Sequence, residues 1–129
     1  MWEEECMILT IPGNTPSQKN GKEIAINRKT GQRFVRSNDR VKEWRKMAAL
    51  ELLTQFRGYR VTDYPIDLNI VFWFDNERRH DLDNACAGVM DALVEAMVLE
   101  DDSVKFVSCL TLQYGGVDKE NPRCEIYID

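Results

Sequence analysis

The feature that most constrains the fold is the run at residues 66–74, Ile-Asp-Leu-Asn-Ile-Val-Phe-Trp-Phe. Its β-branched and aromatic side chains are typical of a strand in the centre of a sheet. Asp67 and Asn69 interrupt it, and it is far shorter than the roughly 20 apolar residues that a membrane-spanning helix needs. The sequence therefore predicts a strand buried within a domain and no membrane span.

Other stretches of the chain also have the composition of strands. Residues 24–27 and 33–36 flank the turn at residues 28–31, which predicts a hairpin with a basic tip. Charged and apolar residues alternate over residues 123–128, as in a closing edge strand. The remaining strands are expected at residues 7–11 and 104–114, the second ended by a turn at Gly115 and Gly116.

Two segments have helical periodicity. The first helix begins after a cap at Ser37 or Asn38 and ends near Phe56, and the second runs from a cap at Asp83 or Asn84. The second ends near Met97. The apolar face of the first comprises Val41, Trp44, Ala48, Leu52 and Phe56. In a chain of 129 residues, these elements predict a single α+β (α/β-like) domain with a mixed sheet and two main helices.

The net charge of −5 conceals two oppositely charged regions. Residues 19–46 carry ten basic and three acidic side chains, a local net charge of +7, which suits DNA phosphates. Residues 81–102 contain no Lys or Arg and seven acids, which suit metal cations. The acids are Asp81, Asp83, Asp91, Glu95, Glu100, Asp101 and Asp102.

Asp81 and Asp83 lie where a strand region passes into a helix. In an extended backbone, residues two apart face the same side, so both carboxylates could point toward one metal. Glu100, Asp101 or Asp102 could add a third carboxylate if the intervening helix returns the chain to that point. Mg²⁺ prefers such oxygen ligands. The structural alternative is that Asp81, Asp83 and Asn84 only cap the helix and that Asp101 and Asp102 belong to a polar loop.

Three segments in this order resemble the RusA Holliday junction resolvases of bacteria and their phages. They are Arg78-Arg79-His80-Asp81-Leu82-Asp83-Asn84, Asp91-Ala92-Leu93 and Leu99-Glu100-Asp101-Asp102-Ser103-Val104. The opening residues 11–13 and 16–20, with their prolines, are also similar to the start of the family pattern. The resemblance covers roughly residues 8–107.

The resemblance implies a magnesium-dependent endonuclease, acting as a homodimer that nicks two opposed strands of a four-way DNA junction in recombination and repair. The family's essential carboxylates match Asp81, Asp83 and Asp102, and Asp101, beside Asp102, is a further candidate ligand. Asn84 and Asp91 match supporting positions. Contacts with the DNA backbone are expected from Lys19, Lys22, Arg28, Lys29, Arg33, Arg36, Arg78 and Arg79.

One position departs from the family pattern. The family has a catalytic lysine three residues after the Asn of D-x-D-N, and this chain has Ala87 there. Either another cation, with Arg79, Lys105 and Lys19 as candidates, takes its place, or the protein is a weak or inactive nuclease that still binds branched DNA. A third reading is a structural or metal-binding domain whose acids only solvate it.

The acidic N-terminus, Met1-Trp2-Glu3-Glu4-Glu5, is unlike the basic start of a secretory signal. The four cysteines form no C-x-x-C pair, and the chain has one histidine, so a zinc site has little support. We expect reduced, mostly buried thiols in a cytoplasmic protein.

Overall fold

The computed structural model describes residues 7–17, 22–37, 39–57 and 61–129. The elements are β1 (Met7–Pro12), β2 (Lys22–Ile26), β3 (Arg33–Ser37), α1 (Asp39–Phe56), β4 (Ile66–Phe74), α2 (Leu82–Glu95), β5 (Val107–Val117) and β6 (Arg123–Ile128). The prediction of an α+β fold with two helices and a mixed sheet is confirmed.

The main sheet has the strand order β1-β6-β4-β5. The apolar run of β4 lies in its interior, as predicted, antiparallel to β6 and parallel to β5. The prediction that residues 123–128 form an edge strand is wrong, because β6 pairs with both β1 and β4. Alternating polarity reports that one face of a strand is buried, and it does not report whether the strand has one neighbour or two.

β5 forms an edge of the sheet and differs from its predicted bounds. It begins at Val107 and continues to Val117, so Gly115 and Gly116 lie within the strand and do not end it. A Cβ atom at Gly115 would lie 2.5 Å from the Trp73 ring, and Gly116 has a φ of +132°. The glycines let β5 pass close to Trp73, next to a register shift between Phe72 and Trp73.

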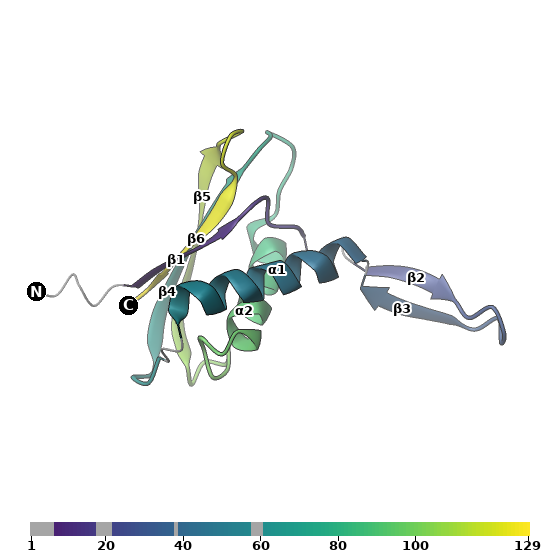
Figure 1. The fold of residues 1–129 in the computed structure, drawn as a ribbon, viewed down its shortest axis with the longest axis horizontal. Coiled ribbons are helices and arrows are strands. Elements are labelled where there is room, and N and C mark those ends of the chain that lie inside the picture. Colours follow the sequence, from purple (N-terminus) through teal and green to yellow (C-terminus); the bar gives the residue numbers. More distant parts are fainter. Residues whose placement is uncertain (1–6, 18–21, 38, 58–60) are drawn as a thin grey trace, which may run out of the picture.

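Both helices pack on the same face of the main sheet, where α1 contacts β1 and α2, and α2 contacts β5. Alternate residues of β4 and β6 face this core, including Leu68, Ile70 and Phe72. The predicted apolar face of α1 is buried at all five positions. Figure 1 shows the β2–β3 hairpin projecting away from this body beyond the start of α1. Among the described residues, no helix has the length and apolar character to cross a membrane.

Replacing Phe72 by alanine should strongly destabilise the protein. Phe72 is fully buried in the sheet core, so the loss of buried surface and the cavity left behind should lower the free energy of unfolding by about 3–5 kcal/mol. Phe34 on the hairpin is 47% exposed, and Phe34→Ala should change the free energy of unfolding by less than about 0.5 kcal/mol. Urea denaturation of both variants measures the difference, and equal losses would contradict this core assignment.

Candidate active site and nucleic-acid interface

The first candidate carboxylates lie where β4 passes into α2. Asp81 is the N-cap of α2, with an extended backbone (φ −103°, ψ 118°), and the helix begins at Leu82. The predicted cap at Asp83 or Asn84 is therefore wrong by two or three residues. Asp83 lies in the first helical turn, so the backbone is extended at Asp81 but helical at Asp83. The two carboxylates therefore do not share one side of an extended segment, contrary to the prediction from the sequence.

The Asp81 side chain is held from both sides. The Arg79 Nε lies 3.4 Å from Asp81 Oδ1, and the amide nitrogen of Asn84 lies 3.4 Å from Oδ2. Asp81 makes no capping hydrogen bond with its side chain, so its carboxylate is not engaged with the helix N-terminus. Asp83 is exposed and accepts a hydrogen bond from the Asn84 backbone N–H (2.9 Å). Asn84 therefore contacts the Asp81 carboxylate through its side chain, and its supporting role in the site stays a prediction.

The loop before Asp81 is fixed by packing and hydrogen bonds. The His80 ring stacks on Phe74, with centroids 3.7 Å apart and planes at 2°. Nε2 of His80 lies 3.1 Å from Asn76 Oδ1, which also accepts the Arg78 backbone N–H. Asn14, from the loop after β1, accepts the backbone N–H of Asp75. These contacts hold the backbone from which Arg78 and Arg79 extend.

Asp102 lies at the opposite end of the sheet. Because β4 and β5 are parallel neighbours, α2 carries the chain from the carboxyl end of β4 back to the amino end of β5. The Glu100 backbone N–H donates to the hydroxyl of Tyr64, which precedes β4 (3.1 Å). The nine residues of β4 span about 30 Å. The expectation that α2 returns Asp101 and Asp102 to Asp81 is therefore wrong within one chain.

The donor chemistry around Asp81 suits a hard cation, but one chain supplies only part of a ligand set. Among the described residues, no three His, Cys, Asp or Glu side chains are placed to hold a metal ion. Burial raises the pKa of Cys86 to about 11 and that of Cys124 to about 12, so these thiols stay protonated at neutral pH and are poor ligands. The oxygen donors of Asp81, Asp83 and Asn84 fit Mg²⁺ better than a softer metal.

Ala87 lies on the exposed side of α2. The residues Asp83, Ala87, Asp91 and Glu95 recur every fourth position and are all exposed, so they form one stripe along the helix. Ala87 is one turn after Asp83. Of the candidate substitute cations, Arg79 contacts Asp81, Lys105 lies at the Asp102 end of the sheet, and Lys19 is outside the described residues.

The basic hairpin tip is an ordered turn. Oδ1 of Asn27 accepts the backbone N–H groups of Lys29 (2.9 Å) and Thr30 (3.3 Å), and Gly31 has a φ of +73°. Arg28, Lys29 and Arg33 are all exposed around it. Lys19 lies outside the described residues, as do the side chains of Lys22 and Arg36.

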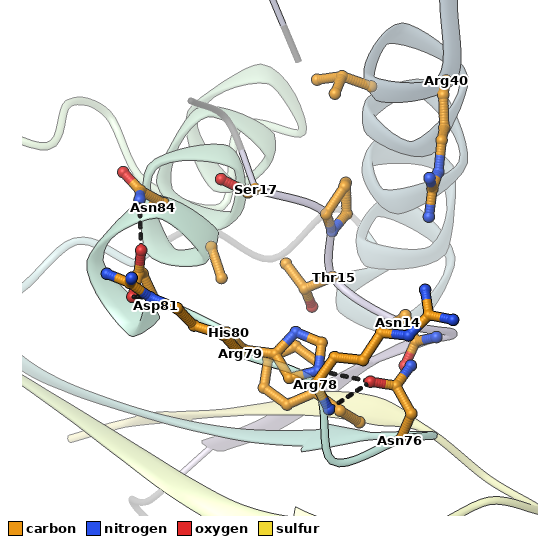
Figure 2. A pocket seen from close by; sticks show the side chains of 14 residues that line it. Asn14, Thr15, Ser17, Arg40, Asn76, Arg78, Arg79, His80, Asp81 and Asn84 are labelled. Atoms are coloured by element: carbon orange, nitrogen blue, oxygen red, sulfur yellow. Dashed lines mark hydrogen bonds and ion pairs between the residues drawn. The ribbon is translucent and has the colours of Figure 1, made fainter. Parts of the chain in front are cut away.

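A cavity of about 560 Å³ lies beside Asp81 (Figure 2). Arg78 and Arg79 line it, and so does Arg40 from the first turn of α1, which the sequence interpretation did not select. Its position in the basic stretch was the only signal for Arg40, because no spacing rule links residue 40 with residue 78. Asn14 and Asn76 were missed for the same reason.

Comparison with known families gives one match. The profile of the endodeoxyribonuclease RusA matches residues 14–129. The chain belongs to the RusA family of endodeoxyribonucleases, which resolve Holliday junctions. No curated protein matches the sequence significantly. The family places the protein among nucleases that bind branched DNA, in agreement with the resemblance recognised in the sequence.

Proposed function

We propose that this protein is a magnesium-dependent Holliday junction resolvase that cuts two opposed strands of a four-way junction. The observation that carries the proposal is the carboxylate of Asp81. Asp81 stands directly before α2, its side chain makes no capping hydrogen bond, and it lines a cavity that arginines also line. A metal-binding carboxylate next to phosphate-binding side chains is the arrangement that phosphodiester hydrolysis needs.

Two copies of the chain would complete each site. Asp81 and Asp83 of one copy lie at one end of the sheet, and Asp102 lies at the other. A two-fold dimer with the two chains in opposite directions would bring Asp102 of each copy to Asp81 of the other copy, which makes two equivalent sites. Asp101, and Lys105 as a basic group, would come with it. The same symmetry suits a junction that must be cut at two equivalent positions.

Within such a site, each residue has a defined task. Asp81, Asp83 and Asp102 would hold the ion, and Asn84 would keep the Asp81 carboxylate oriented. Mg²⁺, when bound, polarises a phosphodiester and lowers the pKa of a bound water. Arg79 would offset the negative charge of the carboxylate and the phosphate. Asp91 would stay on the exposed stripe of α2 as a supporting residue.

Cleavage with and without magnesium tests the chemical part of the proposal. The purified protein should nick a synthetic four-way junction with Mg²⁺ and leave it intact with EDTA. Asp81→Asn removes a ligand charge with little change in size and should abolish cleavage while leaving junction binding intact. Full activity of Asp81→Asn would contradict the assignment of the site.

The hairpin tip should supply phosphate contacts. Replacing Arg28, Lys29 and Arg33 together by alanine should weaken junction binding strongly and lower the slope of log K against log salt by about 2.7. Lys119→Ala, which removes a charge from an exposed position outside the basic stretch, serves as the control. Binding titrations at several salt concentrations measure both, and equal slopes in the hairpin variant and the unaltered protein would exclude the tip from the interface.

A second candidate function is branched-DNA binding with little or no cleavage. Ala87 favours it, because this exposed position of α2 lacks the lysine of the family pattern. Tight junction binding without magnesium-dependent nicks would select this function. In either case the substrate would be cellular or phage DNA, which we expect the protein to meet in the cytoplasm.

A further inference from the structure

The cavity beside Asp81 is formed by segments far apart in the sequence. Its walls are the loop at residues 14–17, the first turn of α1, the end of β4 with the following loop, and the first turn of α2. At about 560 Å³, it has the size of a site for a nucleotide-sized ligand. Asp81 stands at one side of it, whereas Asp83 and Asp102 are not among the lining residues.

The charged side chains of the cavity favour the binding of an anion. Arg40 enters from α1, and Arg78 and Arg79 enter from the loop after β4 (Figure 2). Arg79 is paired with Asp81. Across the described part of the chain, Arg40 and Arg78 form no ion pair with a carboxylate. Both side chains are exposed and line one cavity, so their guanidinium groups are available to an anion that enters it.

The walls of the cavity are organised before any ligand arrives. Asn14 bonds the backbone of Asp75, and Asn76 bonds both His80 and the Arg78 backbone. His80 is stacked on the buried Phe74. The backbone that carries Arg78 is thus fixed against the loop after β1, so ligand binding would require ordering of the arginine side chains but little else.

We propose that this cavity binds a DNA phosphodiester next to the one that is cut, with Arg40 and Arg78 as its clamp. The proposal rests on the proposed function, because Asp81 itself lines the cavity and a strand bound at Asp81 would lie beside Arg40 and Arg78. Guanidinium groups can bind two phosphate oxygens at once, which fixes the position of the strand as well as adding affinity. Arg40 is thereby a DNA-positioning residue.

The clamp can be tested with DNA in which a single phosphate is replaced by an uncharged analogue. Methylphosphonate is placed at one position at a time along the cut strand of a four-way junction, and binding is measured without divalent metal. At one position the substitution should weaken binding to the unaltered protein roughly tenfold, weaken binding to Arg40→Ala distinctly less, and leave binding to the double variant Arg40→Ala/Arg78→Ala unchanged. Lys46→Ala, an exposed α1 lysine outside the cavity, should retain the full penalty there. Identical penalties in Arg40→Ala and the unaltered protein at every position would overturn the proposal.

A second measurement separates a DNA phosphodiester from free phosphate. Titration with dithymidine monophosphate should shift the Nε–Hε NMR signals of Arg40 and Arg78 but not that of Arg57, an exposed arginine outside the cavity. A response to inorganic phosphate alone, or an equal response of Arg57, would overturn the DNA assignment. If the binding penalty depends on Arg40 but the protein never cuts, the clamp is supported and the nuclease function is contradicted. If the protein cuts and no penalty depends on Arg40, the nuclease function is supported and the clamp is contradicted.

Discussion

An equimolar mixture of Asp83→Asn and Asp102→Asn subunits is expected to cut a four-way junction that neither variant cuts alone. Each pure variant lacks one carboxylate in both of its sites, and loss of such a group should lower the cleavage rate on the order of 10²–10³-fold or more. In a mixed dimer, one site receives both mutations and the other receives none. The recovery follows because Asp83 and Asp102 lie at opposite ends of the sheet.

The expected recovery is partial and has a specific product. With random pairing, roughly half of the dimers are mixed and each has one intact site, so about a quarter of all sites are active. A mixed dimer should therefore release singly nicked junctions. The matched control is a mixture of Asp81→Asn with Asp83→Asn, whose mutations lie at the same end of the sheet and should not complement. No recovery in the first mixture, after subunit exchange is verified, would contradict a site shared between two copies.

Replacing Ala87 by lysine is expected to raise the cleavage rate by about 10²–10³-fold if no other cation compensates. Ala87 is exposed on α2 one turn after Asp83. Side chains on a helix lean toward its N-terminus, so a lysine at this position would extend toward the carboxylates. Its ammonium group could then stabilise the negative charge that develops on the phosphate during cleavage.

The control for this substitution is Ala87→Met, which adds a similar chain without the charge. Single-turnover cleavage at saturating protein separates a faster chemical step from tighter binding. An unchanged rate in Ala87→Lys would show that a present cation already performs the role, and Arg79→Ala would then be expected to lose activity, since Arg79 contacts Asp81. Equal stimulation by lysine and methionine would contradict an electrostatic role for this position.

Much of the fold could be predicted because local patterns determine it. The apolar face of α1 follows from helical spacing, and the β4 strand follows from its β-branched and aromatic residues. The hairpin follows from two short strands around a turn that ends at Gly31, although Asn27, which was expected in the first strand, belongs to the turn. Neighbour relations in the sheet could not be predicted in the same way, and β6 was therefore placed at an edge.

The candidate site was predictable only in part for the same reason. Asp81 and Asn84 are close in sequence, so their contact follows from the start of one helix. The place of Asp102 depends on β5 being parallel to β4, which no spacing within the segment reveals. Arg40 joins the cavity through the packing of α1 against the rest of the domain, again a long-range relation.

Cleavage of a synthetic four-way junction with magnesium, beside Asp83→Asn and a linear duplex of the same sequence, tests directly whether the protein is a resolvase. We expect two nicks at symmetric positions on opposed strands, absent in Asp83→Asn and absent from the linear duplex. Equal cutting of the linear duplex, nicks that persist in Asp83→Asn, or no cutting and no binding of the junction would contradict this function.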